Sequence, residues 1–372
     1  MKNKYFRSPW LEVMIMVGSV VLSYVGLAIL ATQERVMVEG EMSVGAVFWI
    51  LLAFFLISVA IAAISVIAGI GGGVIFTPLM LAFTNVNSLV VRGAGLIVAM
   101  FSGLISTGVF LKKGMGNYRL CLVMMLSQAV GALSGAIAAV AAADAFGKVG
   151  EGVLRAALGG VLIAVAVYFL IGGQKLEWPE VHSVDRFTQL LHMDSSYYEE
   201  SEGRVRSYRV KKAGLGILLI FFVGVLGGFF GMGGGWAITP VLNMAMGVPL
   251  KLAAANSGII LGVGSCVSIW PYMFAGSIIP LFVLPWLSGQ VVGGYVGSLV
   301  LAKIKVNVVR LILIGIMFYT SFGLVTKGLS MIGLIGNVPQ IWHMIIFAVI
   351  IVIVSVMVVL QIRSEKREGT DG

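Results

Sequence analysis

The residues best placed to bind a ligand lie in two copies of one glycine-rich stretch. GIGGGVIFTP at 69–78 recurs as GMGGGWAITP at 231–240, an offset of 162 residues. Glycine costs a helix about 1 kcal/mol per residue relative to alanine, so each triplet beside a long apolar segment predicts a broken membrane helix. We expect each helix to restart with Thr77 or Thr239 as its N-cap and the following proline in its first position. Backbone N–H groups beside such a helix start can bind an anion.

Polar side chains at matched positions extend this candidate site. Gln128 and Gln290 share the 162-residue offset and lie within apolar segments, where polar residues tend to face the protein interior or a water-filled cavity. We expect the amide groups of both glutamines to donate hydrogen bonds to an oxyanion. The alternative for the glutamines is hydrogen bonding between helices, and the alternative for the glycines is that they only allow close helix packing. The predicted substrate-binding residues are Gly71, Gly72, Gly73, Thr77, Gln128, Gly233, Gly234, Gly235, Thr239, Asn256, Ser257 and Gln290.

The composition places the chain in a membrane. Hydrophobic residues make up 59%, charged residues only 11%, and the mean hydropathy is +1.04, whereas soluble domains carry about 25% charged residues. A length of 372 residues allows roughly ten spanning helices of about 20 residues each. The basic residues that give the chain its net charge of +9 lie mostly in short loops between apolar segments. They therefore indicate membrane topology and not nucleic-acid binding. Cys121 and Cys266 lie in apolar segments and are expected to be packing residues.

The apolar segments predict an all-α polytopic protein with ten spanning helices and two short re-entrant helices, at 76–84 and 238–247. Folding each short helix back puts most basic residues on the side of the N-terminus, which the positive-inside rule assigns to the cytoplasm, together with the C-terminus. The apolar segment that follows the basic N-terminus is too long for a typical signal peptide and is expected to be retained. The predicted spans are 11–31, 44–68, 92–111, 119–142, 153–172, 213–230, 253–273, 281–302, 308–326 and 341–361.

This topology makes the two repeats inverted, because the first starts outside and the second starts inside, as in many secondary transporters. Gly131 with Gly135, and Gly293 with Gly297, form matched small-residue faces that should let helices approach closely. Three arginines at the starts of spans, Arg92, Arg155 and Arg310, are expected at the membrane interface, with outer anion attraction as the alternative for Arg92. The predicted organisation is 1–43 tail and extra helix, 44–172 first repeat, 173–212 cytoplasmic linker, 213–326 second repeat and 327–372 extra helix and tail.

Residue types that are missing from the predicted core spans argue against several classes of function. Neither repeat has an aspartate or glutamate within a predicted core span, so carboxylate proton relays and carboxylate sodium sites lack their usual residues. An inside-negative potential favours anion exit by about 2.3 kcal/mol per charge per 100 mV, so potential-driven export needs no such residue. Nucleophile, phosphate-loop and metal-ligand motifs are also missing, which argues against an enzyme, a metal site or a cofactor. A non-transporting scaffold and an importer of a small organic anion remain alternatives.

The glycine motifs resemble those of the TauE/SafE family of sulfite exporter-like permeases. The resemblance rests on GIGGGVIFTPLM, on GMGGGWAITPVL and on AAANSGIIL at 253–261. It implies a multi-pass inner-membrane transporter that exports sulfite, a sulfonate or a related anion. Family members often carry Ala-Thr-Ser after the broken helix, but the first repeat here has Gly-Ala-Gly at 93–95, which leaves the substrate open. The expected partners are a small anion and the lipid bilayer, and a homo-oligomer is left open.

Overall fold

A computed structural model describes most of the chain between residues 44 and 350. Six segments within the described residues are long and apolar enough to cross a membrane, which confirms an all-α, multi-pass membrane protein. The predicted span at 11–31, most of that at 341–361, and Gly69 lie outside the described residues. The described residues are 44–68, 70–84, 86–112, 114–171, 179, 181, 183–199, 204–300, 306–336, 338–339, 342, 345–346 and 349–350.

The first half of the chain forms four helices: α2 (Val44–Ala68), the short α3 (Gly73–Phe83), α4 (Ser88–Lys112) and α5 (Tyr118–Ile171). Two apolar segments within α5 are each long enough to span a membrane. They are separated at Gly147, whose φ of 52° and ψ of −141° are not helical. The loop expected between the fourth and fifth spans is therefore reduced to a single-residue break.

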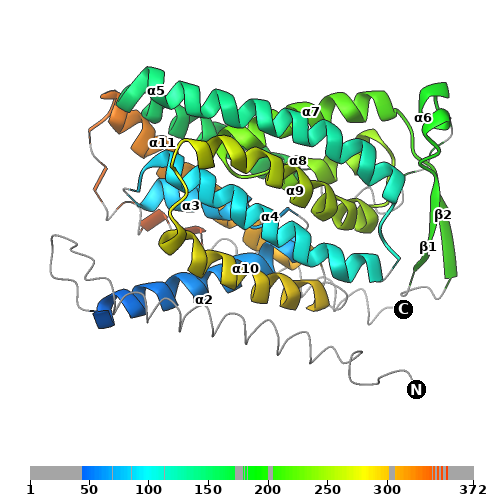
Figure 1. The fold of residues 1–372 in the computed structure, drawn as a ribbon, viewed down its shortest axis with the longest axis horizontal. Helices are drawn as coiled ribbons and strands as arrows, with labels where there is room; N and C mark the ends of the chain where they lie inside the picture. The colour runs from blue at the N-terminus through cyan, green and yellow to red at the C-terminus, as the bar shows by residue number, and fades with distance from the viewer. Residues whose placement is uncertain are drawn as a thin grey trace.

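The second half repeats this order of elements. It contains α7 (Ala213–Phe230), α8 (Gly235–Pro240) continued by a π-helical segment η2 (Val241–Ala245), α9 (Leu250–Phe274), α10 (Pro280–Val300) and α11 (Val306–Ile332). The starts of α8, α9 and α10 each follow those of α3, α4 and α5 by the same 162 residues as the glycine motifs. In Figure 1, α5 runs along α7, and α10 runs along α2.

The predicted N-caps of the two short helices are wrong. The helices begin at Gly73 and Gly235, four residues before the two threonines, and contain both the threonines and the prolines. The reason is the glycine two residues before each start, Gly71 or Gly233, whose φ of 78° or 70° reverses the chain so that the helix can begin at once. The threonine hydroxyls then serve tertiary contacts.

Glycine faces determine how closely the long helices pack. A methyl group added at Gly131 on α5 would overlap the carbonyl oxygen of Phe221 on α7. At the matched position, a methyl group on Gly293 of α10 would overlap the carbonyl oxygen of Val59 on α2. Gly293 follows Gly131 by 162 residues, and Phe221 follows Val59 by the same number. The two halves therefore pack their helices through equivalent contacts. The predicted small-residue faces are confirmed as sites of backbone contact.

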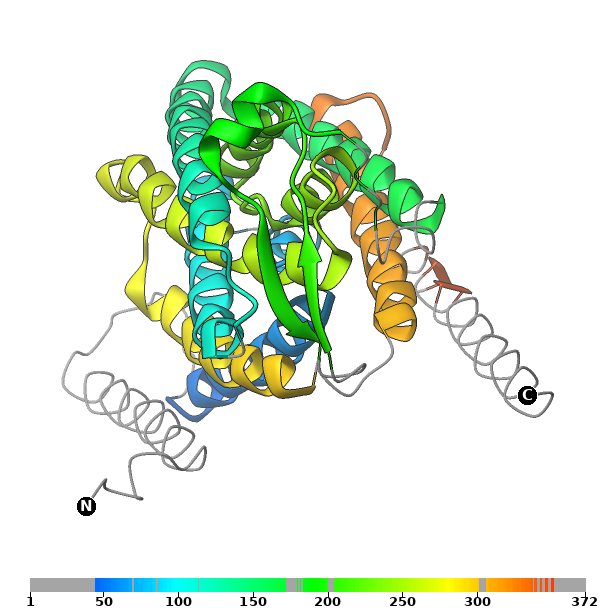
Figure 2. The same cartoon turned by 90° about the vertical axis from the view of Figure 1, so that its right-hand side faces the viewer.

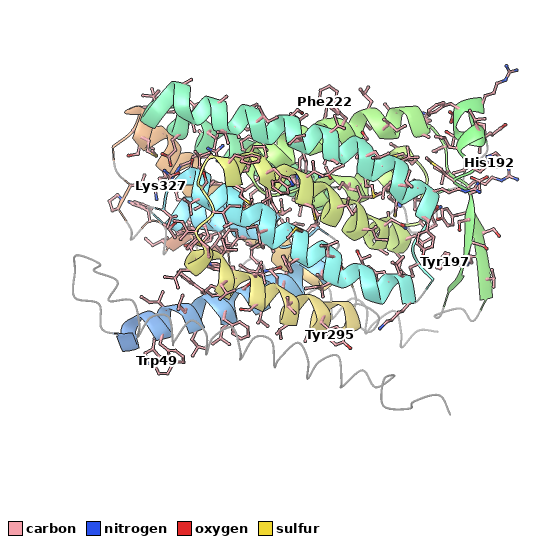
Figure 3. All side chains as sticks on the ribbon, viewed as in Figure 1. Trp49, His192, Tyr197, Phe222, Tyr295 and Lys327 are labelled. Carbon is pink, nitrogen blue, oxygen red and sulfur yellow. The ribbon has the colours of Figure 1, made fainter. Side chains whose placement is uncertain are left out.

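The linker between the halves adds structure that the sequence did not predict. It forms a short helix, α6 (Arg186–Leu191), and an antiparallel hairpin of β1 (Ser195–Glu199) and β2 (Arg204–Tyr208). Figure 2 shows these elements together across one end of the helix bundle, which we call the linker end. Lys327 lies at the opposite end, far from Tyr197 of the hairpin (Figure 3).

Hydrogen bonds attach the linker to the membrane helices. Asn117, just before α5, donates through Nδ2 to the Met193 carbonyl (2.6 Å) and to the Tyr208 hydroxyl (2.9 Å). Asp185 caps α6 by accepting from Thr188 and also accepts from the Lys212 amide (2.7 Å), at the start of α7. These hydrogen bonds, chiefly from the Thr188 hydroxyl, hold the pKa of Asp185 below its ordinary value.

Gly131→Ala tests whether backbone contact sets the packing of α5 against α7. We expect it to lower the free energy of unfolding by about 1–3 kcal/mol, because the methyl group can fit only if a helix moves. Gly160→Ala, on the same helix but with open space around it, should be neutral or stabilising by up to about 1 kcal/mol. Thermal unfolding in detergent measures both, and equal melting temperatures would contradict the prediction.

Candidate functional site

The two glycine turns meet at the centre of the protein. We call residues 70–73 the first glycine turn and residues 231–235 the second. A methyl group added at Gly73 would lie 2.8 Å from the carbonyl oxygen of Met232, and one added at Gly235 would overlap the carbonyl oxygen of Ile70. All four residues are buried. The turns are therefore in backbone contact with each other.

Each glutamine lies against the glycine turn of the other half. A methyl group added at Gly72 would overlap Oε1 of Gln290, and one added at Gly234 would lie 3.3 Å from Nε2 of Gln128. Both glutamine side chains are 0% exposed. The structure thus brings together the predicted glycines and both predicted glutamines in one buried region.

The two glutamines differ in their hydrogen bonds. Gln290 donates through Nε2 to the hydroxyl (3.0 Å) and the carbonyl (3.2 Å) of Ser58, which leaves only its Oε1 without a partner in the described structure. Neither Nε2 nor Oε1 of Gln128 has a hydrogen-bond partner among the described residues. The cause is visible in the sequence, because the position equivalent to Ser58 is Ile220, which cannot accept a hydrogen bond through its side chain.

A second difference follows the same pattern. In the first turn, the Gly72 amide donates to the Ser102 hydroxyl (3.1 Å). The residue equivalent to Ser102 is Gly264, and Gln128 occupies the space where its side chain would be. Leaving a buried polar atom unpaired costs about 1–3 kcal/mol, so the amide of Gln128 is unfavourable as a purely structural group.

Ser265 joins this group, although the sequence did not single it out. Its side chain is 0% exposed, and its hydroxyl has no hydrogen-bond partner in the described part of the chain. A methyl group added at Gly233 would lie 3.4 Å from that hydroxyl. The equivalent position in the first half is Gly103, so a search for matched polar pairs misses Ser265. The second turn therefore has unpartnered polar atoms of both Gln128 and Ser265 beside it.

The two predicted threonines bond across the centre. Thr77 donates to the carbonyl of Gly231 (2.6 Å) in the second turn, and Thr239 donates to the hydroxyl of Ser257 (2.9 Å) on α9. Ser257 also donates to the carbonyl of Ala254, within its own helix (2.9 Å). The Thr77 hydroxyl therefore joins α3 to the second turn, and the Thr239 hydroxyl joins α8 to α9.

Asn256 is used by the protein itself. Its Nδ2 donates to the carbonyls of Leu252 (2.7 Å) and Met115 (3.2 Å), and its Oδ1 accepts from the amide of Asn117 (2.8 Å). The structure thus places Asn256 in contact with the segment that precedes α5 and holds the linker hairpin. It is not brought together with the unpartnered atoms of Gln128.

A small cavity lies beside the first glycine turn, toward the linker end. Its volume is about 10 Å³, close to the smallest that holds one water molecule. It lies between α4 and α9, and its polar lining comes from serines. An oxyanion larger than water does not fit in this cavity, and both central glutamines are 0% exposed, so we call the described conformation occluded. The residues that line this cavity include Gly71, Ser102, Ser106, Phe110, Ala254 and Ser257.

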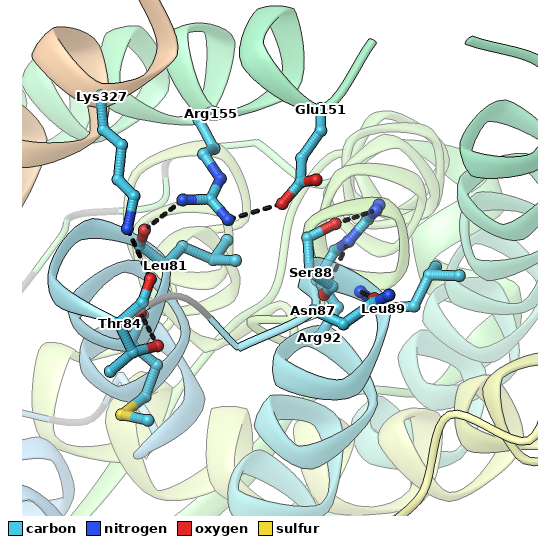
Figure 4. A network of polar contacts seen from close by, with 10 residues as sticks. Leu81, Thr84, Asn87, Ser88, Leu89, Arg92, Glu151, Arg155 and Lys327 are labelled. Atoms are coloured by element: carbon cyan, nitrogen blue, oxygen red, sulfur yellow. Dashed lines mark hydrogen bonds and ion pairs between the residues drawn. The ribbon is translucent and has the colours of Figure 1, made fainter. Parts of the chain in front are cut away.

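Arg92 and Arg155 are buried, 1% and 3% exposed, so their side chains contact protein and do not extend toward lipid headgroups. Arg155 donates to the Leu81 carbonyl (2.8 Å) near the end of α3 and pairs with Glu151 (Figure 4). Lys327 donates to the Thr84 carbonyl (2.5 Å) at the same helix end. Cations near a helix C-terminus are stabilised by its partial negative charge. The side chain of Arg310 lies outside the described structure.

Comparison with known proteins agrees with this architecture. The family model described as sulfite exporter TauE/SafE matches residues 54–324. A probable membrane transporter protein, YunE of Bacillus subtilis strain 168, is 24% identical over 269 residues, which cover 70% of this chain and 92% of that protein. No solved structure matches. The chain therefore belongs to the TauE/SafE sulfite exporter family, a family of membrane transporters.

Proposed function

We propose that the protein is a permease that moves a small oxyanion, a sulfite-like sulfur oxyanion or an organosulfonate, across the inner membrane. The observation that carries this proposal is the amide of Gln128. It is completely buried, neither of its polar atoms has a partner in the described structure, and it lies beside the glycine turn of the other half. A polar group held in this way is ready to bind a polar ligand that the occluded conformation excludes.

The chemistry around the second turn suits an oxyanion. The amide of Gln128 can donate two hydrogen bonds and the hydroxyl of Ser265 one, while Oε1 of Gln128 can accept from the O–H group of a protonated anion or from water. No carboxylate is placed among these groups in the described structure, so nothing there repels a negative charge. These neutral donors bind an anion more weakly than a positively charged side chain would. The bound anion can therefore dissociate on the other side of the membrane.

Alternating access between two inverted repeats is the mechanism we infer. Its support is the 162-residue offset shared by the element boundaries and by the contacts of Gly131 with Phe221 and of Gly293 with Val59. In inverted repeats the two halves can exchange conformations, which opens the site to one side and then to the other. The excess of basic loops assigns the linker end and both termini to the cytoplasm.

Export is the direction that energetics favour. A small anion that leaves an inside-negative cell gains about 2.3 kcal/mol per charge per 100 mV. In the described structure Glu151 of α5 is paired with Arg155, and no carboxylate lies beside the glycine turns to couple transport to protons or sodium in the usual way. The membrane potential is then sufficient as the driving force.

Gln128→Leu separates a binding role from a packing role. Leucine removes both unpartnered polar atoms, so we expect an unchanged or higher melting temperature together with at least about tenfold slower sulfite flux in proteoliposomes. Gln128→Glu should also abolish flux, because its charge repels an anion. Gln189→Leu, on the exposed α6, is the control with normal flux. Normal flux with a lowered melting temperature in Gln128→Leu would show that Gln128 is a packing residue.

Proteoliposomes with imposed ion gradients test the energy source. For an anion that carries one net charge, we expect the ratio of its concentrations on the two sides at equilibrium to change about tenfold for roughly every 60 mV of membrane potential. A proton gradient at zero potential should drive no accumulation of a fully ionised anion such as sulfate. Transport that requires a proton gradient and ignores the potential would overturn uncoupled export. The absence of flux for every sulfur oxyanion, sulfonate and small carboxylate tested would favour a scaffold.

A further inference from the structure

Two buried side chains tie three helices together at the end opposite the linker. Tyr272 of α9 donates through its hydroxyl to the carbonyl of Gly228 (2.8 Å), and Arg92 of α4 donates through Nη1 to the carbonyl of Phe229 (3.2 Å). Both acceptors belong to the last turn of α7, which ends at Phe230. Arg92 is 1% exposed and Tyr272 is 0% exposed. We call this pair of side chains the Arg92–Tyr272 latch.

The latch lies directly on the second glycine turn. A methyl group added at Gly231, the first residue of that turn, would overlap the backbone of Arg92. Ser268 and Ser265 follow Tyr272 inward along α9 at intervals of four and three residues, so the three lie on one face of the helix. Ser268 is also 0% exposed. This face leads from the latch to the unpartnered hydroxyl of Ser265.

The hydrogen bonds of Arg92 go only to neutral groups in the described structure, and Glu151, a carboxylate close enough to attract its charge, is bonded to Arg155. Its Nε and Nη2 donate to the carbonyl (3.2 Å) and hydroxyl (2.9 Å) of Ser88, one turn earlier on the same helix (Figure 4). Its third acceptor is Phe229, at the partly negative end of α7. An oxyanion can accept two parallel hydrogen bonds from a guanidinium, and such charge-assisted pairs are stronger than bonds to neutral carbonyls. A small anion can therefore compete for Arg92.

The matched positions at the linker end are different. The residues equivalent to Arg92 and Tyr272 are Ala254 and Phe110, and both line the small cavity beside the first glycine turn. Ser106, the equivalent of Ser268, lines it as well. Alanine and phenylalanine side chains cannot form hydrogen bonds to a helix end. The side with the latch is therefore closed by polar contacts, and the other side by apolar packing around a void.

We propose that the Arg92–Tyr272 latch is the outer gate of the permease, and that a small oxyanion opens it by replacing the Phe229 carbonyl at the guanidinium of Arg92. This rests on the proposed transport function and adds the residue that selects an anion at the outer side. Release of Arg92 from Phe229 frees α4 from the end of α7 and leaves only the Tyr272 hydroxyl to hold α9 there, which loosens the cover over the face that carries Ser268. In export the anion reaches this guanidinium from the centre, so the latch lets anions out without a fixed charge in the occluded centre.

Cysteine labelling tests the gate without requiring transport. Ser268→Cys, in a chain whose Cys121 and Cys266 are replaced by serine, is exposed to a membrane-impermeant maleimide from each side of oriented vesicles. We expect slow labelling with the latch intact, and at least about fivefold faster labelling from the side opposite the linker in Tyr272→Phe. Lys327→Gln, which removes another cation at the same end, is the control and should not change the rate. An unchanged rate in Tyr272→Phe would overturn the gate.

The matched position distinguishes gating from general loosening. Ser106→Cys, labelled from the linker end, should not react faster in Tyr272→Phe than with the latch intact. Faster labelling at both positions would mean that the variant loosens the whole bundle, and the gate would then be rejected.

The anion arm of the experiment uses sulfate and methanesulfonate, which do not react with maleimides. With Arg92 present, either anion should speed labelling of Ser268→Cys at least about threefold, whereas chloride at equal ionic strength should not. Arg92→Gln should label fast without an anion and lose the response, and Arg92→Lys should keep a weaker response, because an ammonium keeps the charge without the two parallel hydrogen bonds. A response that persists in Arg92→Gln would overturn the role of Arg92. A gate that responds in a protein without flux would leave this inference standing and reject the transport proposal.

Discussion

The structure depends on backbone contact between the two glycine turns. Gly73 lies against the carbonyl of Met232, and Gly235 lies against that of Ile70, so any side chain at either glycine would push the turns apart. Because the turns touch, the helices that follow them start side by side at the centre of the bundle. The threonine of α3 then reaches the carbonyl of Gly231, and both glutamines meet the opposite turn. The candidate site follows from this single close approach.

Small departures from symmetry give the centre its chemistry. If both halves were identical, Nε2 of Gln128 would donate to a serine as Nε2 of Gln290 does. Replacing the equivalent of Ser58 by Ile220 leaves the amide of Gln128 unpaired, and replacing the equivalent of Arg92 by Ala254 leaves only one end closed by a guanidinium. The matched positions set the architecture, while the unmatched ones mark where a ligand and a gate are expected.

The sequence predicted the six spanning segments found in the described region, the breaks at the glycine triplets and the closeness of the glutamines to those breaks, whereas the predicted spans 281–302 and 308–326 are not among those six. These features follow from hydropathy and from the steric needs of glycine, which are local or repeated along the chain. The helix starts at Gly73 and Gly235 were missed, because a threonine before a proline resembles an N-cap when the left-handed glycine is not considered. The burial of Arg92 and the role of Ser265 were missed, because both depend on segments far apart in the chain.

The crosswise placement of the glutamines has a consequence for how the protein is made. The hydrogen bond between Gln290 and Ser58 joins residues 232 positions apart, and Gln128 meets a turn that is synthesised about a hundred residues after it. The first half therefore enters the membrane with its glycine turn and its buried amide still lacking their neighbours. The centre can be completed only when α7 to α10 have followed. A ribosome that stalls within the linker would leave a half-protein with polar backbone facing lipid, a marker by which membrane quality control can recognise incomplete chains.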